Sequence, residues 1–197
     1  MIRWALHKGI SRFERQWNYD ASYMHDIADA SPRAASLFNR VTALGRFRVG
    51  VPAEVYSAAG ITAVRQEDCG PCTQIGVTMA ERSGVDPAVL RALLADDEAA
   101  MPANVALAWK FTRATLAHDP AADDLREEIV RRWGRVGLVS LAFAIVTARL
   151  YPTVKYALGH GKACMRVVVA GAPVPLDHGR AAEAPAIAHT NPATRIA

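Results

Sequence analysis

The sequence has few cysteines, few aromatic residues and no long apolar run. Of its 197 residues, three are cysteines and 7% are aromatic. The longest uncharged run, residues 136–148, is shorter than the roughly 20 apolar residues that a membrane-spanning helix needs. The first residues carry charges every few positions, unlike a signal peptide. We therefore predict a cytoplasmic protein without a membrane span, whose cysteines favour redox or metal chemistry over a disulfide framework.

The sequence also lacks a strong excess of charge of one sign. Lys and Arg number 23 and Asp and Glu 19, which gives a formal net charge of +4. The basic residues are spread along the chain, so we expect no nucleic-acid partner. Hydrophobic residues at 51% and charged residues at 21% are typical of a globular protein.

Helix signals occur along most of the chain. Alanine, the best helix former, is abundant, and Ser31-Pro32 and Asp86-Pro87 each place a helix-capping residue before a proline. Pro152 is expected to kink or break the last long helix, which then resumes to about Met165. Only the stretch 166–170 resembles a strand, and we expect it to have no partner. The sequence therefore predicts an all-α, multi-helix bundle.

Three segments differ in composition. Residues 1–50 are predicted to form N-terminal helices for docking or oligomer contacts. An apolar stripe at helical spacing lies in this segment, at Ile2, Leu6, Ile10, Phe13 and Trp17. Its alternative interpretation is a helix on a membrane surface. Residues 51–170 are predicted to form the helical core, and residues 171–197, rich in proline and alanine, a flexible tail.

The most informative motif is the Cys-Gly-Pro-Cys sequence at Cys69 to Cys72, which we expect to open a helix. At a helix N-terminus, unpaired backbone N–H groups and the helix dipole favour a thiolate over a thiol. A redox-active dithiol is one interpretation. A metal site completed by His160 and Cys164, or two incidental core cysteines, are the others. A thioredoxin fold does not fit, because helical rather than strand spacing precedes the motif.

A helix, a polar joint and a CxxC that opens a second helix resemble the alkylhydroperoxidase D / carboxymuconolactone decarboxylase family. The later stretch of residues 104–159 strengthens the resemblance, which covers roughly residues 52–159. The resemblance implies an all-helical homo-oligomer, and we expect no cofactor. It also implies reduction of hydroperoxides or disulfides by Cys69 and Cys72, with re-reduction by a dithiol protein.

The chain departs from the family at two positions of the proton relay. The family motif has a glutamate where this chain has Ser57 and a histidine where it has Gly76. Glu54 and Glu67 are the carboxylates that we consider as replacements. We therefore expect weak or atypical peroxidase activity, because loss of a general base costs rate.

The sequence leaves the attacking cysteine and two rival functions open. Helix-end electrostatics favour Cys69 as the attacking thiol, whereas the resemblance favours Cys72. One rival function is a non-enzymatic helical protein that senses redox state or binds a metal. The other is a carboxymuconolactone decarboxylase-like lyase, which does not rely on a cysteine pair.

Overall fold

The computed structural model describes residues 2–161 and 166–175. Those residues are mostly helical, which confirms the predicted all-α fold. The elements, in chain order, are α1 (Ile2–Trp17), α2 (Ser22–Ala30), α3 (Pro32–Val41), η1 (Leu44–Arg46), α4 (Ala53–Arg65), α5 (Gly70–Arg82), α6 (Pro87–Leu94), η2 (Glu98–Ala100), α7 (Ala103–Ala117), α8 (Ala122–Ala157), β1 (Arg166–Val169) and β2 (Ala172–Pro175).

The capping residues found in the sequence start the helices that they predict. The Ser31 side chain accepts a hydrogen bond from the backbone N–H of Ala34 at the start of α3. The Asp86 side chain accepts one from Ala88 at the start of α6. Each cap satisfies an N–H group that has no partner within the helix, so these starts are fixed locally.

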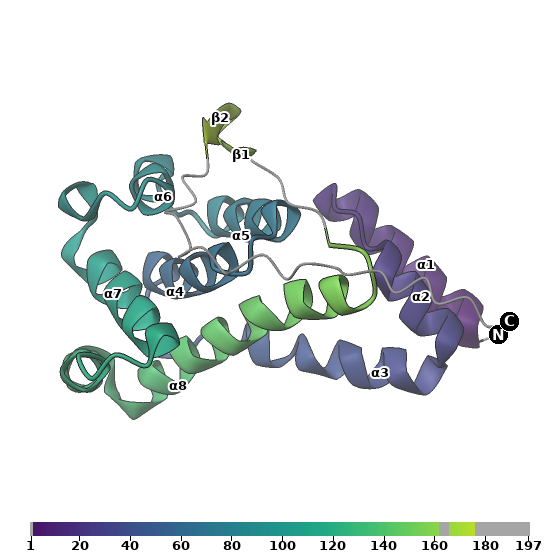
Figure 1. Cartoon of the computed structure of the whole chain (residues 1–197), viewed down its shortest axis with the longest axis horizontal. Coiled ribbons are helices and arrows are strands. Elements are labelled where there is room, and N and C mark those ends of the chain that lie inside the picture. The colour runs from purple at the N-terminus through teal and green to yellow at the C-terminus, as the bar shows by residue number, and fades with distance from the viewer. Residues whose placement is uncertain (1, 162–165, 176–197) are drawn as a thin grey trace, which may run out of the picture.

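Helix α4 is central, with α5, α7 and α8 packed around it (Figure 1). More than half of its side chains are buried: Val55, Ala58, Ala59, Ile61, Thr62, Ala63 and Val64. Several are alanines, which let neighbouring helices approach closely. Because α4 leads directly into the cysteine motif, this packing also fixes the position of the motif.

Helix α8 consists of two helical segments that meet at Gly134. This glycine has φ 70° and ψ 178°, outside the helical region. Pro152, expected to kink or break the second segment, does not break it; the helix continues through the proline and ends at Ala157, earlier than the predicted end near Met165. The proline is itself buried, and near the helix end it removes only one backbone hydrogen bond.

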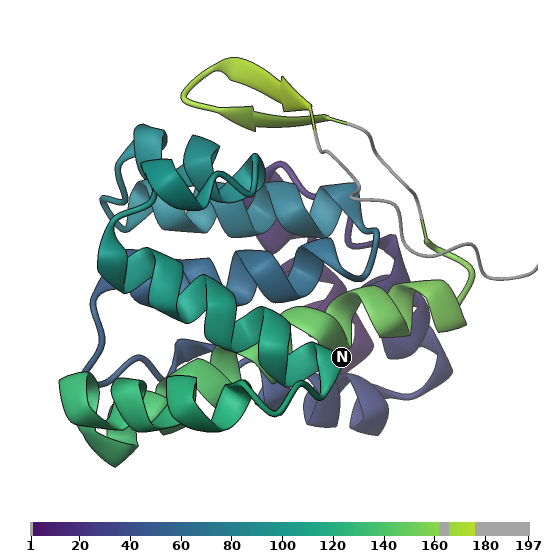
Figure 2. The same ribbon diagram turned by 60° about the vertical axis from the view of Figure 1, so that its left-hand side comes forward.

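By length and composition alone, α8 is the one helix among the described residues that has the properties of a membrane span. Only 39% of its apolar window is buried within the fold. Helix α8 nevertheless packs on α4 and α7, as a core helix does (Figure 2).

The prediction of a lone strand is wrong. Strand β1 pairs antiparallel with β2, and Val167 lies opposite Val174. Ala170 and Gly171 both have positive φ, as a tight two-residue hairpin turn requires. Residues 171–175 of the predicted flexible tail therefore belong to the hairpin, and residues 176–197 lie outside the described residues. The sequence did not predict β2 because the strand contains prolines, which are compatible only with an edge strand.

The hairpin lies against α5 and α6 (Figures 1 and 2). Val167 and Val169 are fully buried in the core. The Gln74 side chain both donates to the carbonyl of Val168 and accepts from its N–H, at 3.0 and 2.7 Å. One amide of α5 therefore fixes the register of the hairpin on the helix that holds the cysteines.

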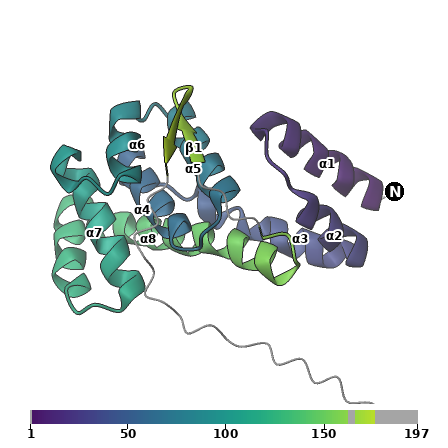
Figure 3. The same ribbon diagram turned by 45° about the horizontal axis from the view of Figure 1, so that its top comes forward.

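The N-terminal helices α1 to α3 pack beside the end of α8 (Figure 3). Ile10, Phe13 and Trp17 of the apolar stripe contact a small cluster around the buried Tyr19 and Tyr23. Ile2, at the other end of the stripe, is exposed. The described chain therefore covers the stripe only in part.

Candidate dithiol site

The predicted helix start at the cysteine motif is confirmed. Cys69 is the N-cap of α5, and Cys72 lies in the first turn. The two form a disulfide, with their Cα atoms 5.3 Å apart, within the usual range for this bond. Asp68 takes a positive φ of 51° immediately before the motif. The chain therefore turns sharply from α4 into α5 and presents both sulfurs at the same helix end.

The disulfide is buried among apolar side chains. Cys69 is 1% exposed and Cys72 5% exposed. They pack with Val64 near the end of α4 and with Ala148 of α8. An apolar setting raises the free energy of a thiolate, so a buried dithiol needs a polar partner to ionise readily.

The joint between α4 and α5 is fastened to α8. The Glu67 carboxylate pairs with the Arg149 guanidinium. The Tyr156 hydroxyl donates to the carbonyl of Asp68 at 2.8 Å. Two polar contacts from α8 thus hold the residues that precede Cys69.

The structure places Glu54 and Glu67, the two carboxylates considered as replacements for the proton relay, in different surroundings. Glu67 is next to the motif, and its carboxylate is engaged by Arg149. Glu54 lies in the first turn of α4, whose opposite end leads to the cysteines. Arg65 lies eleven positions after Glu54, which is about 16 Å along the helix axis.

The position of the missing histidine is one helical turn beyond Cys72. Cys72 and Gly76 are four residues apart on α5, so their side-chain directions share a face. A Cβ at Gly76 would lie 3.5 Å from Ile61 of α4, which is an ordinary contact. The backbone there accepts a side chain.

Sequence reasoning missed a polar group that does reach a sulfur. The Tyr19 hydroxyl lies 3.6 Å from Cys72 Sγ in a buried contact. Lys155, 2% exposed, places its Nζ 4.8 Å from the ring centroid of Tyr19 and 5.5 Å from that of Tyr23. Tyr19 is in the joint between α1 and α2, outside the range of the family resemblance, and no sequence pattern indicates the contact.

Burial makes the tyrosines near the disulfide weak acids. Desolvation raises the pKa of Tyr19 to about 12, although a hydrogen bond from Tyr23 lowers it in part. Desolvation also raises the pKa of Tyr23. Both hydroxyls therefore stay protonated around neutral pH and act as hydrogen-bond donors.

The residues of the alternative metal site are only partly described. Both ring nitrogens of His160 have partners on α2, Asp26 at 2.6 Å and Ser22 at 3.1 Å. Cys164 lies outside the described residues. Within the described ranges, no group of three or more His, Cys, Asp and Glu side chains is arranged to hold a metal ion.

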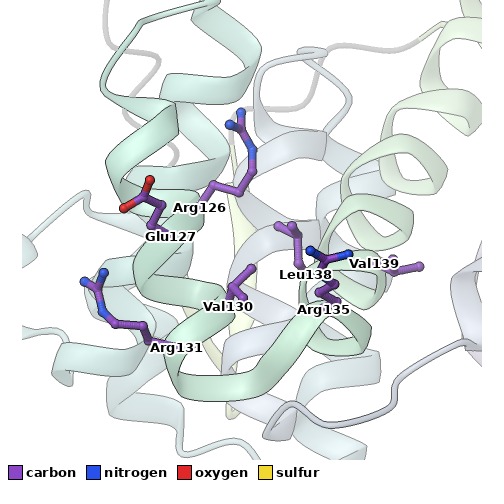
Figure 4. Close-up of a pocket in the computed structure, with 7 residues that line it drawn as sticks. All are labelled: Arg126, Glu127, Val130, Arg131, Arg135, Leu138 and Val139. Carbon is purple, nitrogen blue, oxygen red and sulfur yellow. The ribbon is translucent and has the colours of Figure 1, made fainter.

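A groove lies at the bend of α8 (Figure 4). It is lined on both sides of the bend by Arg126, Glu127, Val130, Arg131, Arg135, Leu138 and Val139. Arg131 pairs with Glu128 beside it. Neither a cysteine nor a histidine is among the residues that line this groove.

No protein-family model, no curated protein and no solved structure matches the chain. The site itself consists of a buried disulfide at a helix N-terminus, a tyrosine hydroxyl on one sulfur and a buried lysine over the ring of that tyrosine.

Proposed function

We propose that the protein is a thiol–disulfide oxidoreductase that uses Cys69 and Cys72 as a reversible dithiol, resembling alkylhydroperoxidase D. The observation that carries the proposal is the disulfide at the N-terminus of α5. A helix N-terminus stabilises a thiolate, and the CxxC spacing lets the second sulfur close the disulfide.

In the oxidative half of the cycle, one cysteine thiolate attacks a hydroperoxide oxygen. The S–O bond forms as the O–O bond breaks, and the leaving alkoxide takes a proton to become an alcohol. The second thiol then attacks the sulfenic acid, which releases water and forms the disulfide. A dithiol protein supplies two electrons and two protons to restore both thiols.

Coupled turnover tests the proposal. The reduced protein is mixed with an alkyl hydroperoxide and a small dithiol, and loss of peroxide is followed. We expect slow, saturable turnover that depends on the cysteine pair. A rate equal to that of the dithiol alone would contradict the proposal.

The second candidate function is a non-enzymatic redox sensor of the same fold. Burial of both sulfurs favours it, because a buried disulfide exchanges slowly. In that case the disulfide forms with oxidant, but catalytic turnover does not exceed one equivalent of peroxide.

Restoring the histidine of the family motif should raise peroxidase activity. In Gly76→His, the imidazole stands one turn from Cys72 and supplies the general base that the chain lacks. Such assistance is typically worth about 10²–10⁴ in rate, and we expect at least about a ten-fold gain in the rate of peroxide loss.

Gly60→His is the matched control for this gain. Gly60 lies inside α4, and a Cβ there would meet no atom within 4 Å. An equal gain in both variants would show that the effect does not come from placement beside Cys72.

We also propose that the protein forms a homo-oligomer through one face of α8. Val136, Val139 and Val146 are 41–52% exposed on this helix, although valine favours burial. Val146→Lys places a charge on that face. Light scattering should give an oligomer for the wild type and a smaller species for the variant; a monomeric wild type at micromolar concentration would contradict the proposal.

A further inference from the structure

The contact between Tyr19 and Cys72 has a defined direction in the oxidised protein. A disulfide sulfur has no hydrogen, so the phenol is the donor across the 3.6 Å separation. Both residues are buried, which keeps competing water away from the contact. A hydrogen bond to sulfur in such a setting strengthens when the sulfur becomes an anion.

Lys155 restrains the tyrosine ring from the side of α8. Its Nζ lies over the ring faces of both Tyr19 and Tyr23. A buried cation on an aromatic face is held by the ring quadrupole. Lys155 therefore packs on the same tyrosine whose hydroxyl contacts Cys72.

We propose that Tyr19 is a catalytic residue that stabilises the Cys72 thiolate by a hydrogen bond, and that Lys155 is the positioning residue for its ring. The inference rests on the proposed dithiol function and adds roles to it. Cys72 is the leaving sulfur when the disulfide opens, and Cys69 is the sulfur that exchanges with the reductant.

Reduction of the disulfide proceeds through a mixed disulfide at Cys69. A thiolate of the dithiol reductant attacks Cys69 Sγ and forms a mixed disulfide. The Cys69–Cys72 bond breaks, and its electron pair goes to Cys72 Sγ, which accepts the hydrogen bond from Tyr19. The second reductant thiolate then displaces Cys69, and the two protons lost by the reductant are taken up by the two cysteines.

The hydroxyl keeps its own proton in this step. With a pKa of about 12, Tyr19 is a weaker acid than an ordinary thiol, so it donates a hydrogen bond and not the proton itself. Neither predicted carboxylate supplies this contact, because Glu67 pairs with Arg149 and Glu54 lies at the far end of α4.

The pKa of the Cys72 thiol tests the proposal. In Cys69→Ser/Cys164→Ser, Cys72 is the only thiol, and thiolate absorbance near 240 nm follows its titration. Subtracting the titration of the protein with all three cysteines replaced removes the tyrosine signal. We expect Tyr19→Phe in this background to raise the pKa by about one unit.

The same substitution should slow reduction of the disulfide in the full chain. A leaving thiol with a pKa higher by one unit leaves more slowly, and we expect about a three-fold lower rate with dithiothreitol. Lys155→Met tests the contact without altering Tyr19. Lys155→Met should also raise the pKa of the Cys72 thiol. In a protein that already carries Tyr19→Phe, Lys155→Met should cause no further change in this pKa.

Tyr56→Phe is the matched control. Its hydroxyl donates to the carbonyl of Gly45 and is also partly buried, so the same group is lost away from the sulfurs. An unchanged Cys72 pKa in both Tyr19→Phe and Lys155→Met would overturn the inference. If the disulfide still cycles between its oxidised and reduced forms in those variants, the proposed dithiol function stands without the roles assigned to Tyr19 and Lys155. If the wild-type disulfide does not cycle, the proposed function fails, whereas the single-cysteine pKa still decides the role of Tyr19.

Discussion

Cys69→Ser should abolish both the disulfide and the turnover of hydroperoxide. A serine hydroxyl neither forms the bond nor ionises near neutral pH, so the cycle has no second sulfur. We expect the protein-dependent part of the rate to disappear, which leaves the rate of the dithiol reductant alone. The rate of peroxide loss under coupled turnover measures the effect.

Cys164→Ser is the control for this loss. Cys164 lies outside the described residues, and its sequence setting lacks the features of the CxxC. We expect the variant to keep the activity of the wild type. If Cys164→Ser were as inactive as Cys69→Ser, the functional pair would have been assigned wrongly.

Asp96→Ala should lower the free energy of unfolding by about 3 kcal/mol. The Asp96 carboxylate accepts two hydrogen bonds from Arg65, at 2.9 and 3.1 Å, and one from the Trp109 indole at 2.9 Å. Arg65 is largely buried at the end of α4 and also donates to the carbonyl of Leu93, but without Asp96 its charge loses the carboxylate that it pairs with here. Asp96 also has a positive φ of 52°, which alanine tolerates poorly.

Chemical denaturation of two further variants separates these causes. Asp96→Asn keeps a carbonyl acceptor and tolerates the left-handed backbone, so we expect about half the loss. Asp97→Ala, at the next position, removes only an exposed cap on η2 and should cost about 1 kcal/mol or less. An equal loss in Asp96→Ala and Asp97→Ala would contradict a structural role for the partly buried network of Asp96, Arg65 and Trp109.

Local sequence signals predict the helices well, because each depends on a few neighbouring residues. Ser31, Asp86 and Cys69 stand where a helix begins, and the structure starts α3, α6 and α5 there. The break at Gly134 also follows from local backbone freedom. These features need no knowledge of the tertiary fold.

The features that the sequence did not reveal depend on distant partners. The hairpin has prolines in β2 and is fixed by Gln74, more than ninety residues earlier. Tyr19 reaches Cys72 from a separate part of the chain, and Lys155 reaches Tyr19 from α8. From the sequence alone, Lys155 would be expected to be a solvated side chain. Its burial becomes evident only from its contact with the Tyr19 ring.

The reversible Cys69–Cys72 disulfide is the central claim, and the mass of one peptide tests it most directly. Trypsin should release residues 66–82 as a single peptide that contains both cysteines. The reduced protein is treated with one equivalent of hydroperoxide, the remaining thiols are alkylated, and the peptide is weighed. We predict an unalkylated peptide that is two hydrogens lighter than the same peptide with two free thiols. After treatment with a dithiol and renewed alkylation, the peptide should carry two alkyl groups. A doubly alkylated peptide after oxidant, with a metal ion retained stoichiometrically through dialysis, would contradict the redox account and support a metal site.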